Sequence, residues 1–202
     1  MTGHPAPHLR TDRLVIRLGG LADATAIAAY YRSNRAVLAP LEPRRPESFY
    51  TEAYWQARVL ANRRQFEEGR SVCLFLYPID LDVVIGVINF TAIVGYPAYS
   101  ALLGYSLDQR YWGGGLMTEA LGVALDWVWT HHHLHRISAN HLPDNERSAR
   151  VLAKLGFVRE GYAPDYLLID GAWRDHVLTA LTRRDWQADE IHAALIGHRP
   201  AA

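Results

Sequence analysis

A glycine-rich segment in the middle of the chain has the residue types most suited to chemistry. Residues 103–117 read Leu-Gly-Tyr-Ser-Leu-Asp-Gln-Arg-Tyr-Trp-Gly-Gly-Gly-Leu-Met, which predicts a strand, a tight turn and the start of a helix. Unpaired backbone N–H groups at such a turn point toward one spot, and the helix dipole adds positive potential there. Because glycine has no Cβ, a ligand can approach the backbone closely. The segment therefore predicts an anion site that suits a phosphate or pyrophosphate.

Two common phosphate-binding loops do not fit this segment. A nucleoside-triphosphate loop has a lysine directly after its last glycine, where this chain has Leu116. A dinucleotide fold places its glycines soon after the first strand, whereas these lie halfway along the chain. The spacing that remains is Arg110-x-x-Gly113-x-Gly115. A second segment follows at residues 145–157, reading Asn-Glu-Arg-Ser-Ala-Arg-Val-Leu-Ala-Lys-Leu-Gly-Phe.

Together these segments resemble the two signatures of the GNAT acetyltransferases, in the order and at the separation found in that family. The resemblance extends over nearly the whole chain, from residues 11–17 to residues 173–178. Residues 41–43, 54–58, 135–137, 165–171 and 173–178 are similar to the ribosomal-protein alanine N-acetyltransferases of the RimJ/RimL type. The long C-terminal stretches favour that subgroup over a general small-molecule acetyltransferase.

The resemblance implies direct acetyl transfer from acetyl-CoA to an amine, without an acyl-enzyme. The glycine turn is expected to bind the pyrophosphate, with Arg110 as an additional charge, and the strand before it to bind the pantetheine arm. The cofactor-binding residues so implied are Gly104, Tyr105, Ser106, Leu107, Arg110, Gly113, Gly114, Gly115, Leu116, Met117 and Asn145. Ser148 matches the residue that protonates the leaving thiolate; the alternative is a local hydrogen-bonding role in the first turn of a helix.

The residues that meet the acceptor amine are less well defined by the sequence. Tyr54 and Trp55 could line a groove for a peptide terminus, or pack the helix on which they lie. Asp165, Tyr166 and Asp175 fall in the family-like C-terminal segments and are expected to contact the substrate. Some relatives carry a glutamate just before the glycine loop, but this chain has Gln109, which cannot accept the proton. Asp108, Glu119, Asp165, Asp175 and a water relay all remain open as the base.

Composition narrows the classes of partner. The 202 residues include 21 basic and 21 acidic side chains, a balance that argues against binding nucleic acid mainly by electrostatics. A single cysteine, Cys73, cannot form an internal disulfide, and no segment reads as a signal peptide or membrane span. We expect a cytoplasmic protein without membrane contact. Clustered histidines at 131–135 lack a completing carboxylate or cysteine, so we expect no metal.

The elements that position these residues follow from periodicity and breakers. We expect helices over residues 24–33, 47–68, 116–130 and 145–156, with Asp23 capping the first. Strands are expected over 14–18, 72–79, 83–94, 101–108, 136–140, 157–169 and 172–181. The prolines at 40, 43 and 46 indicate a loop. This order predicts an α+β (mixed α/β) GNAT fold: one domain over residues 1–202, with a core of about 9–187, whose mostly antiparallel twisted sheet of about seven strands is flanked by about four helices.

Three functions are compatible with these observations. The first is an acetyl-CoA-dependent N-acetyltransferase acting on the N-terminal alanine of a small-subunit ribosomal protein. The second is a small-molecule acetyltransferase that modifies an antibiotic or polyamine. The third is a non-catalytic acetyl-CoA-binding or ribosome-associated module, which Gln109 in place of glutamate keeps open.

Overall fold

A computed structural model describes residues 5–183, and these residues form one eight-stranded sheet. The strand order is β1-β2-β3-β4-β5-β6-β8-β7, and every neighbouring pair is antiparallel except β5 with β6. The strands are β1 (His8–Arg10), β2 (Leu14–Leu18), β3 (Val72–Pro78), β4 (Gly86–Val94), β5 (Ser100–Leu107), β6 (Arg136–His141), β7 (Val158–Ile169) and β8 (Ala172–Thr182). The predicted fold class is confirmed, and the extra strand is the short β1, which pairs with β2.

Five α-helices cover the sheet: α1 (Ala24–Ser33), α2 (Arg35–Leu38), α3 (Glu52–Glu67), α4 (Leu116–His132) and α5 (Glu146–Lys154). Short 3-10 turns lie at η1 (Leu21–Asp23), η2 (Ala39–Leu41), η3 (Glu47–Tyr50) and η4 (Gln109–Tyr111). The segment with Pro40, Pro43 and Pro46, expected to be a loop, is irregular except for η2, whereas the helix expected over residues 47–68 is divided into η3 and α3. None of the helices in residues 5–183 is both long and apolar enough to cross a membrane.

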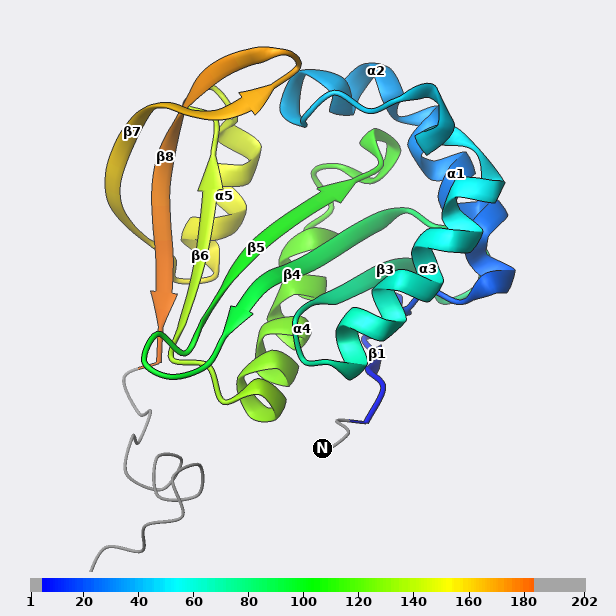
Figure 1. The fold of residues 1–202 in the computed structure, drawn as a ribbon, viewed down its shortest axis with the longest axis horizontal. Helices are drawn as coiled ribbons and strands as arrows, with labels where there is room; N and C mark the ends of the chain where they lie inside the picture. The colour runs from blue at the N-terminus through cyan, green and yellow to red at the C-terminus, as the bar shows by residue number, and fades with distance from the viewer. Residues whose placement is uncertain (1–4, 184–202) are drawn as a thin grey trace, which may run out of the picture.

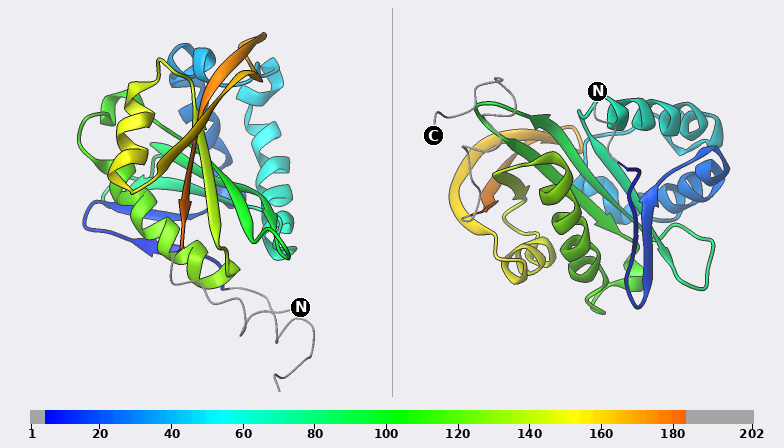
Figure 2. Two further views of the ribbon diagram at one scale, coloured as in Figure 1. Left: turned by 90° about the vertical axis from the view of Figure 1, so that its left-hand side faces the viewer. Right: turned by 90° about the horizontal axis from the view of Figure 1, so that it is seen from below.

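The helices form a layer on each face of the sheet (Figure 2), with α1 and α3 on one side and α4 and α5 on the other. Because successive side chains of a strand point to opposite faces of the sheet, one strand contributes residues to the hydrophobic core on each face. Leu74 and Leu76 of β3 belong to the cluster that packs against α4, whereas Phe75 and Tyr77 belong to the cluster packed against α1 and α3. The strand β3 is thus buried on both faces of the sheet.

The one parallel pair of strands opens the sheet. β5 and β6 are in register only from Ser100 opposite Arg136 to Leu102 opposite Ser138. Beyond these rungs β5 stays paired with β4 up to Leu107, and β6 stays paired with β8 up to His141. The two strands therefore diverge (Figure 1), and the gap between them lies above the N-terminal ends of α4 and α5.

One predicted cap is wrong. Asp23 precedes α1 but its side chain makes no capping hydrogen bond to that helix. Its carboxylate instead accepts the Gly20 N–H at 2.7 Å and two hydrogen bonds from the Arg17 guanidinium, both at 2.7 Å. These contacts lower the pKa of Asp23, although burial opposes them. The Asp23 carboxylate therefore forms an ion pair with Arg17 of β2 in place of the predicted cap of α1.

Candidate functional site

A cleft of about 560 Å³ occupies the gap between β5 and β6. Its walls come from β5, from the turn and first residues of α4, from the end of β6 and from one side of α5. The structure brings together most of the cofactor-binding residues predicted from the sequence, along with the predicted catalytic Ser148. The predicted residues that line the cleft are Gly104, Tyr105, Ser106, Leu107, Gly113, Gly115, Leu116, Met117, Asn145 and Ser148. Gly114 and Arg110 are not among the lining residues.

The glycine turn has the backbone geometry that only glycine adopts readily. Gly113 has φ +82° and Gly115 has φ +76°, so both lie in the left-handed region. Gly114 between them lies outside that region; its carbonyl accepts a hydrogen bond from Arg13 at 2.8 Å. Arg13 also pairs with Glu119 in the first turn of α4. Arg13 thus fixes the turn to the start of α4. Gly115, Leu116 and Met117 line the cleft, so the N-terminal end of α4, where an anion is stabilised, borders it.

One side of α5 adds positive charge to the same cleft. Arg147, Arg150 and Lys154 all line it, and their spacing places them on one face of a helix. Arg147 lies over the ring of Trp112, with its guanidinium carbon 3.9 Å from the centroid. Sequence reasoning missed these three residues, although their three- and four-residue spacing inside the second motif was a usable signal.

Ser148 and Tyr105 form a pair of hydroxyl groups in the cleft. The Tyr105 hydroxyl lies 2.8 Å from Ser148 Oγ and also donates to the Ser148 carbonyl at 3.3 Å. Asn145 caps α5 by accepting the Ser148 N–H at 3.1 Å, which fixes the backbone at Ser148. Burial raises the pKa of Tyr105 to about 12. Tyr105 therefore keeps its proton at neutral pH, and either hydroxyl group of the pair can donate the hydrogen bond between them.

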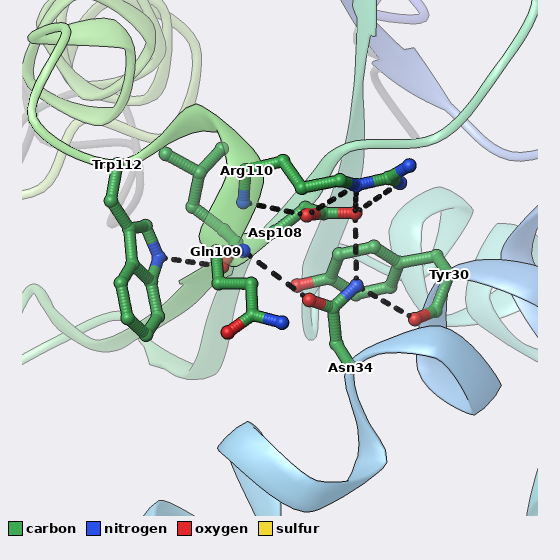
Figure 3. A network of polar contacts seen from close by, with 7 residues as sticks. Tyr30, Asn34, Asp108, Gln109, Arg110 and Trp112 are labelled. Atoms are coloured by element: carbon green, nitrogen blue, oxygen red, sulfur yellow. Dashed lines mark hydrogen bonds and ion pairs between the residues drawn. The ribbon is translucent and has the colours of Figure 1, made fainter.

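A polar network fixes the end of β5 to α1 (Figure 3). Asp108 is 1% exposed and accepts hydrogen bonds from Arg110 and, at 3.1 Å, from the Asn34 side chain. Asn34 in turn accepts the Gln109 N–H at 3.3 Å. The Arg110 hydrogen bonds hold the pKa of Asp108 down, at about 2. Asp108 therefore has a structural role. The Arg110 guanidinium forms an ion pair with Asp108 and does not line the cleft.

Comparison with known proteins identifies the family to which this chain belongs. The sequence model of the GNAT acetyltransferase domain matches residues 13–158. This protein belongs to the GNAT acetyltransferase family. The cleft between β5 and β6, with its glycine turn and its serine on α5, is the part of this GNAT domain that carries both of the motifs identified in the sequence.

Three relatives show how closely this GNAT protein matches characterised members. It is 48% identical over 182 residues to the ribosomal protein uS5-alanine N-acetyltransferase of Escherichia coli strain K12, covering 90% of this chain and 94% of that protein. The crystal structure of ribosomal-protein-S5-alanine acetyltransferase from Vibrio fischeri matches with a TM-score of 0.87 and 38% identity, over 90% of this chain and 99% of that one. RimJ of Mycobacterium smegmatis in complex with CoA-disulfide gives 0.79 and 30%, over 91% and 89%.

The predicted acceptor residues of this GNAT domain do not line the cleft. Trp55 is 4% exposed, stacks on Tyr31 at 4.9 Å and donates its indole N–H to the Phe49 carbonyl at 2.8 Å. Tyr54 packs against the same cluster. Both residues thus occupy the core between α1 and α3. Their helical spacing could not separate a groove from a core, because both place aromatic residues on one helix face.

The remaining predicted acceptor residues lie together on the β7–β8 hairpin. The Asp175 carboxylate accepts the Asp165 N–H at 2.9 Å and the Tyr162 hydroxyl at 2.6 Å. Tyr166 accepts a hydrogen bond from Asn140 at 3.3 Å and packs beside His176, with ring centroids 5.5 Å apart. Asn140 and His176 line the cleft, so Tyr166 borders it through these neighbours.

The cysteine Cys73 lies outside the cleft. Cys73 packs against the core cluster on the α1 side, and burial raises the pKa of its thiol to about 12, so it is protonated at neutral pH. Within residues 5–183 no group of three or more His, Cys, Asp or Glu side chains could hold a metal ion.

Proposed function

We propose that this protein transfers the acetyl group of acetyl-CoA to the α-amine of an N-terminal alanine, and that its acceptor is the ribosomal protein uS5. The observation that carries the proposal is the 48% identity, over 90% of the chain, to an enzyme with that activity. The match to the Vibrio fischeri enzyme, at a TM-score of 0.87, adds support at the level of the fold. We place the reaction in the cytoplasm, where ribosomal proteins are made.

Acetyl-CoA would occupy the cleft between β5 and β6. The amides of Gly113, Gly114, Gly115 and Leu116 would bind the pyrophosphate, supported by the α4 dipole. Arg147, Arg150 and Lys154 supply further positive charge for the phosphate groups. The edge of β5 that β6 leaves unpaired, from Leu103 to Leu107, offers backbone groups to the amides of the pantetheine arm.

Transfer would proceed in one ternary complex. The amine nitrogen attacks the thioester carbonyl, a backbone N–H of β5 stabilises the oxyanion, and the carbon–sulfur bond breaks. The thiolate then takes a proton from Ser148, which Tyr105 holds in place at 2.8 Å. Acetyl-CoA is the cosubstrate, and this chemistry requires neither a metal nor contact with nucleic acid.

Release of CoA thiol tests the proposal. Purified protein and acetyl-CoA are incubated with a peptide carrying the N-terminal residues of a bacterial uS5, with its N-acetylated form, and with a panel of aminoglycosides and polyamines. We expect turnover with the free peptide and none with the blocked one. Turnover with small amines alone would assign a small-molecule acetyltransferase, and CoA binding without any turnover would assign a non-catalytic module.

A further inference from the structure

The acceptor arrives as an ammonium group and must lose a proton before it can attack. The carboxylates that sequence reasoning left open are either bound by other residues or lie outside the cleft lining. Asp108 is bound by Arg110 and Asn34, and Glu119 is paired with Arg13 behind the glycine turn. Asp165 and Asp175 lie on the β7–β8 hairpin, outside the cleft lining. None of the four is placed to receive the proton.

One acidic side chain does line the cleft within the described part of the chain, and it is Glu42. It follows η2, in the segment after α2, and its side chain is only 22% exposed. The same residue lines a second cavity of about 220 Å³, which also shares Tyr31, Leu38 and Arg45 with the cleft. Glu42 therefore stands at the junction of the two spaces.

The backbone of Glu42 is hydrogen-bonded to the β7–β8 turn, which is distant in the sequence but adjacent in space. Its carbonyl accepts the Asp170 N–H from the β7–β8 turn at 3.0 Å, and the neighbouring Arg44 side chain lies 3.4 Å from the Asp170 carboxylate. In Figure 1 the tip of the β7–β8 hairpin lies beside the segment after α2. These contacts fix the backbone of Glu42 where the cleft and the smaller cavity meet.

We propose that Glu42 binds the ammonium group of the acceptor and accepts its proton, and that the smaller cavity holds the residue that follows the acetylated one. This inference rests on the proposed function, because it takes the acceptor to be an amine that reacts with acetyl-CoA. The residues around the smaller cavity that would meet the second residue are Arg35, Leu38, Pro43, Arg44, Phe49 and Tyr50.

The electrostatic surroundings suit a carboxylate that both binds a cation and gains a proton. Burial raises the pKa of Glu42, while Arg45, with Nη2 at 3.4 Å, opposes that rise. The other ionisable groups that line the two cavities are Tyr31, Arg35, Arg44, Tyr50, Tyr105, Tyr111, His141, Arg147, Arg150, Lys154, Asp170 and His176; Tyr30, on α1, also lies within electrostatic reach of Glu42. A negative charge is needed to bind an ammonium group in so enclosed a space. A histidine side chain carries no negative charge in either of its protonation states, so Glu42 fits the task better than His141 or His176.

The proton balance is simple. The Glu42 carboxylate takes one proton from the ammonium and becomes a carboxylic acid, leaving a neutral amine. The amine forms the new C–N bond, the C–S bond breaks, and the thiolate gains a proton from Ser148. The nitrogen loses its second proton as the amide forms, which restores the Ser148 hydroxyl. Glu42 finally releases its proton to solvent, so that one proton is produced per acetyl group transferred.

The test compares Glu42→Gln with the parent and with Glu47→Gln, a matched change at an exposed residue that lines neither cavity. At pH 6.5 we expect Glu42→Gln to slow acetylation of the alanine peptide by about 100-fold. The deficit should narrow toward pH 9, because an α-amine with a pKa of about 8 then arrives deprotonated. The dissociation constant for acetyl-CoA should stay within about twofold of that of the parent, which also shows that the variant is folded. Glu47→Gln should follow the parent at every pH.

Several results would overturn the inference. These are a Glu42→Gln rate equal to that of the parent, a deficit that is constant with pH, or the pH-dependent deficit appearing in His176→Gln instead. If Glu42→Gln does not bind acetyl-CoA, Glu42→Asp replaces it: the shorter carboxylate should keep the pH slope of the parent, and a steeper slope would contradict the proton transfer.

The inference and the proposed function can fail separately. If the parent acetylates only a small amine, the same variants are compared with that amine. If the parent acetylates no amine, the proposed function fails, and Glu42 is judged by calorimetry with the free peptide in the presence of CoA. Weaker binding by Glu42→Gln than by the parent would then support its ammonium site, and equal or absent binding would overturn it.

Discussion

Ser148 and Tyr105 show how a residue gains a role from its neighbour. A serine hydroxyl is a weak acid by itself, but the Tyr105 hydroxyl at 2.8 Å can hold Ser148 Oγ in one orientation and donate to it as it gives up its own proton. The cap from Asn145 fixes the same turn of α5. We propose that this arrangement makes Ser148 the proton donor to the leaving thiolate.

Ser148→Ala should therefore lower the rate of acetyl transfer by about 100-fold, while acetyl-CoA affinity stays the same. Steady-state thiol release gives the rate, and calorimetry gives the affinity. Ser33→Ala, at an exposed serine on α1, serves as the control. A variant as fast as the parent would remove Ser148 from the mechanism.

Two neighbouring glycines allow a matched test of the phosphate turn. Gly113 has φ +82°, whereas Gly114 lies outside the left-handed region, and an added Cβ there would come no closer than 4.0 Å to Arg13. Gly113→Ala should raise the dissociation constant for acetyl-CoA by about tenfold, since strain of roughly 1–2 kcal/mol must be overcome to present the amides. Gly114→Ala should change it far less. Equal affinities of the two variants, measured by calorimetry, would contradict the placement of the pyrophosphate.

Among the elements, β5 is the one on which the site depends. Its first residues pair with β6 and its last residues do not, so one strand both completes the sheet and provides a free edge to the cleft. The end of β5 is fixed to α1 by the contacts of Asp108, and by the Tyr30 hydroxyl, which donates to Ser106 Oγ at 2.9 Å. These polar contacts hold the strand end where sheet pairing has stopped on one side.

Asp108→Asn should lower the free energy of unfolding at pH 7 by about 1–3 kcal/mol, because a buried charged acceptor is lost. The pKa of Asp108 is about 2 in the folded protein, below its value in an unfolded chain. The stabilisation is therefore fully present above about pH 4 and is lost as the pH falls toward 2. Urea unfolding should show a constant difference from pH 7 to 5 that narrows below pH 4.

The exposed Asp126→Asn on α4 is the control for that series, and it should change the free energy of unfolding by less than about 0.5 kcal/mol. A parent-to-variant difference for Asp108→Asn that stays constant down to pH 3 would mean that the charge of Asp108 does not contribute to stability.

At the scale of the whole molecule, the two core clusters share one sheet. Alternate residues of β3 face opposite clusters, so neither helix layer can lose its packing without exposing the same strands. We propose on this basis that residues 9–187 form a single domain, of which 184–187 lie outside the described residues.

One domain predicts one cooperative unfolding transition. Tryptophan fluorescence should report on both layers, because Trp55 lies in one core cluster and Trp127 and Trp129 lie in the other. Far-ultraviolet circular dichroism should report on the whole sheet. We expect the two probes to give coincident urea curves. Separated midpoints would indicate that the two layers unfold independently and would contradict the single domain.

Features set by neighbouring residues could be predicted from the sequence. The bounds of α1 agree with the prediction, and the strand–glycine turn–helix order around Gly113 is as expected. Each depends on backbone conformation or on a hydrogen bond between residues a few positions apart. The helical spacing of 147, 150 and 154 belongs to this class as well, although the prediction did not use it.

The tertiary structure alone decided what distant segments do to one another. Arg13, before β2, pairs with Glu119 of α4, and Asn34, after α1, donates to Asp108, after β5. Trp55 of α3 is buried against Tyr31 of α1. The hydrogen bond from Asp170 to Glu42 joins segments from opposite ends of the chain. Sequence patterns record the local conformational preference of each residue, whereas the partner of a charge or a ring depends on how the sheet brings remote elements together.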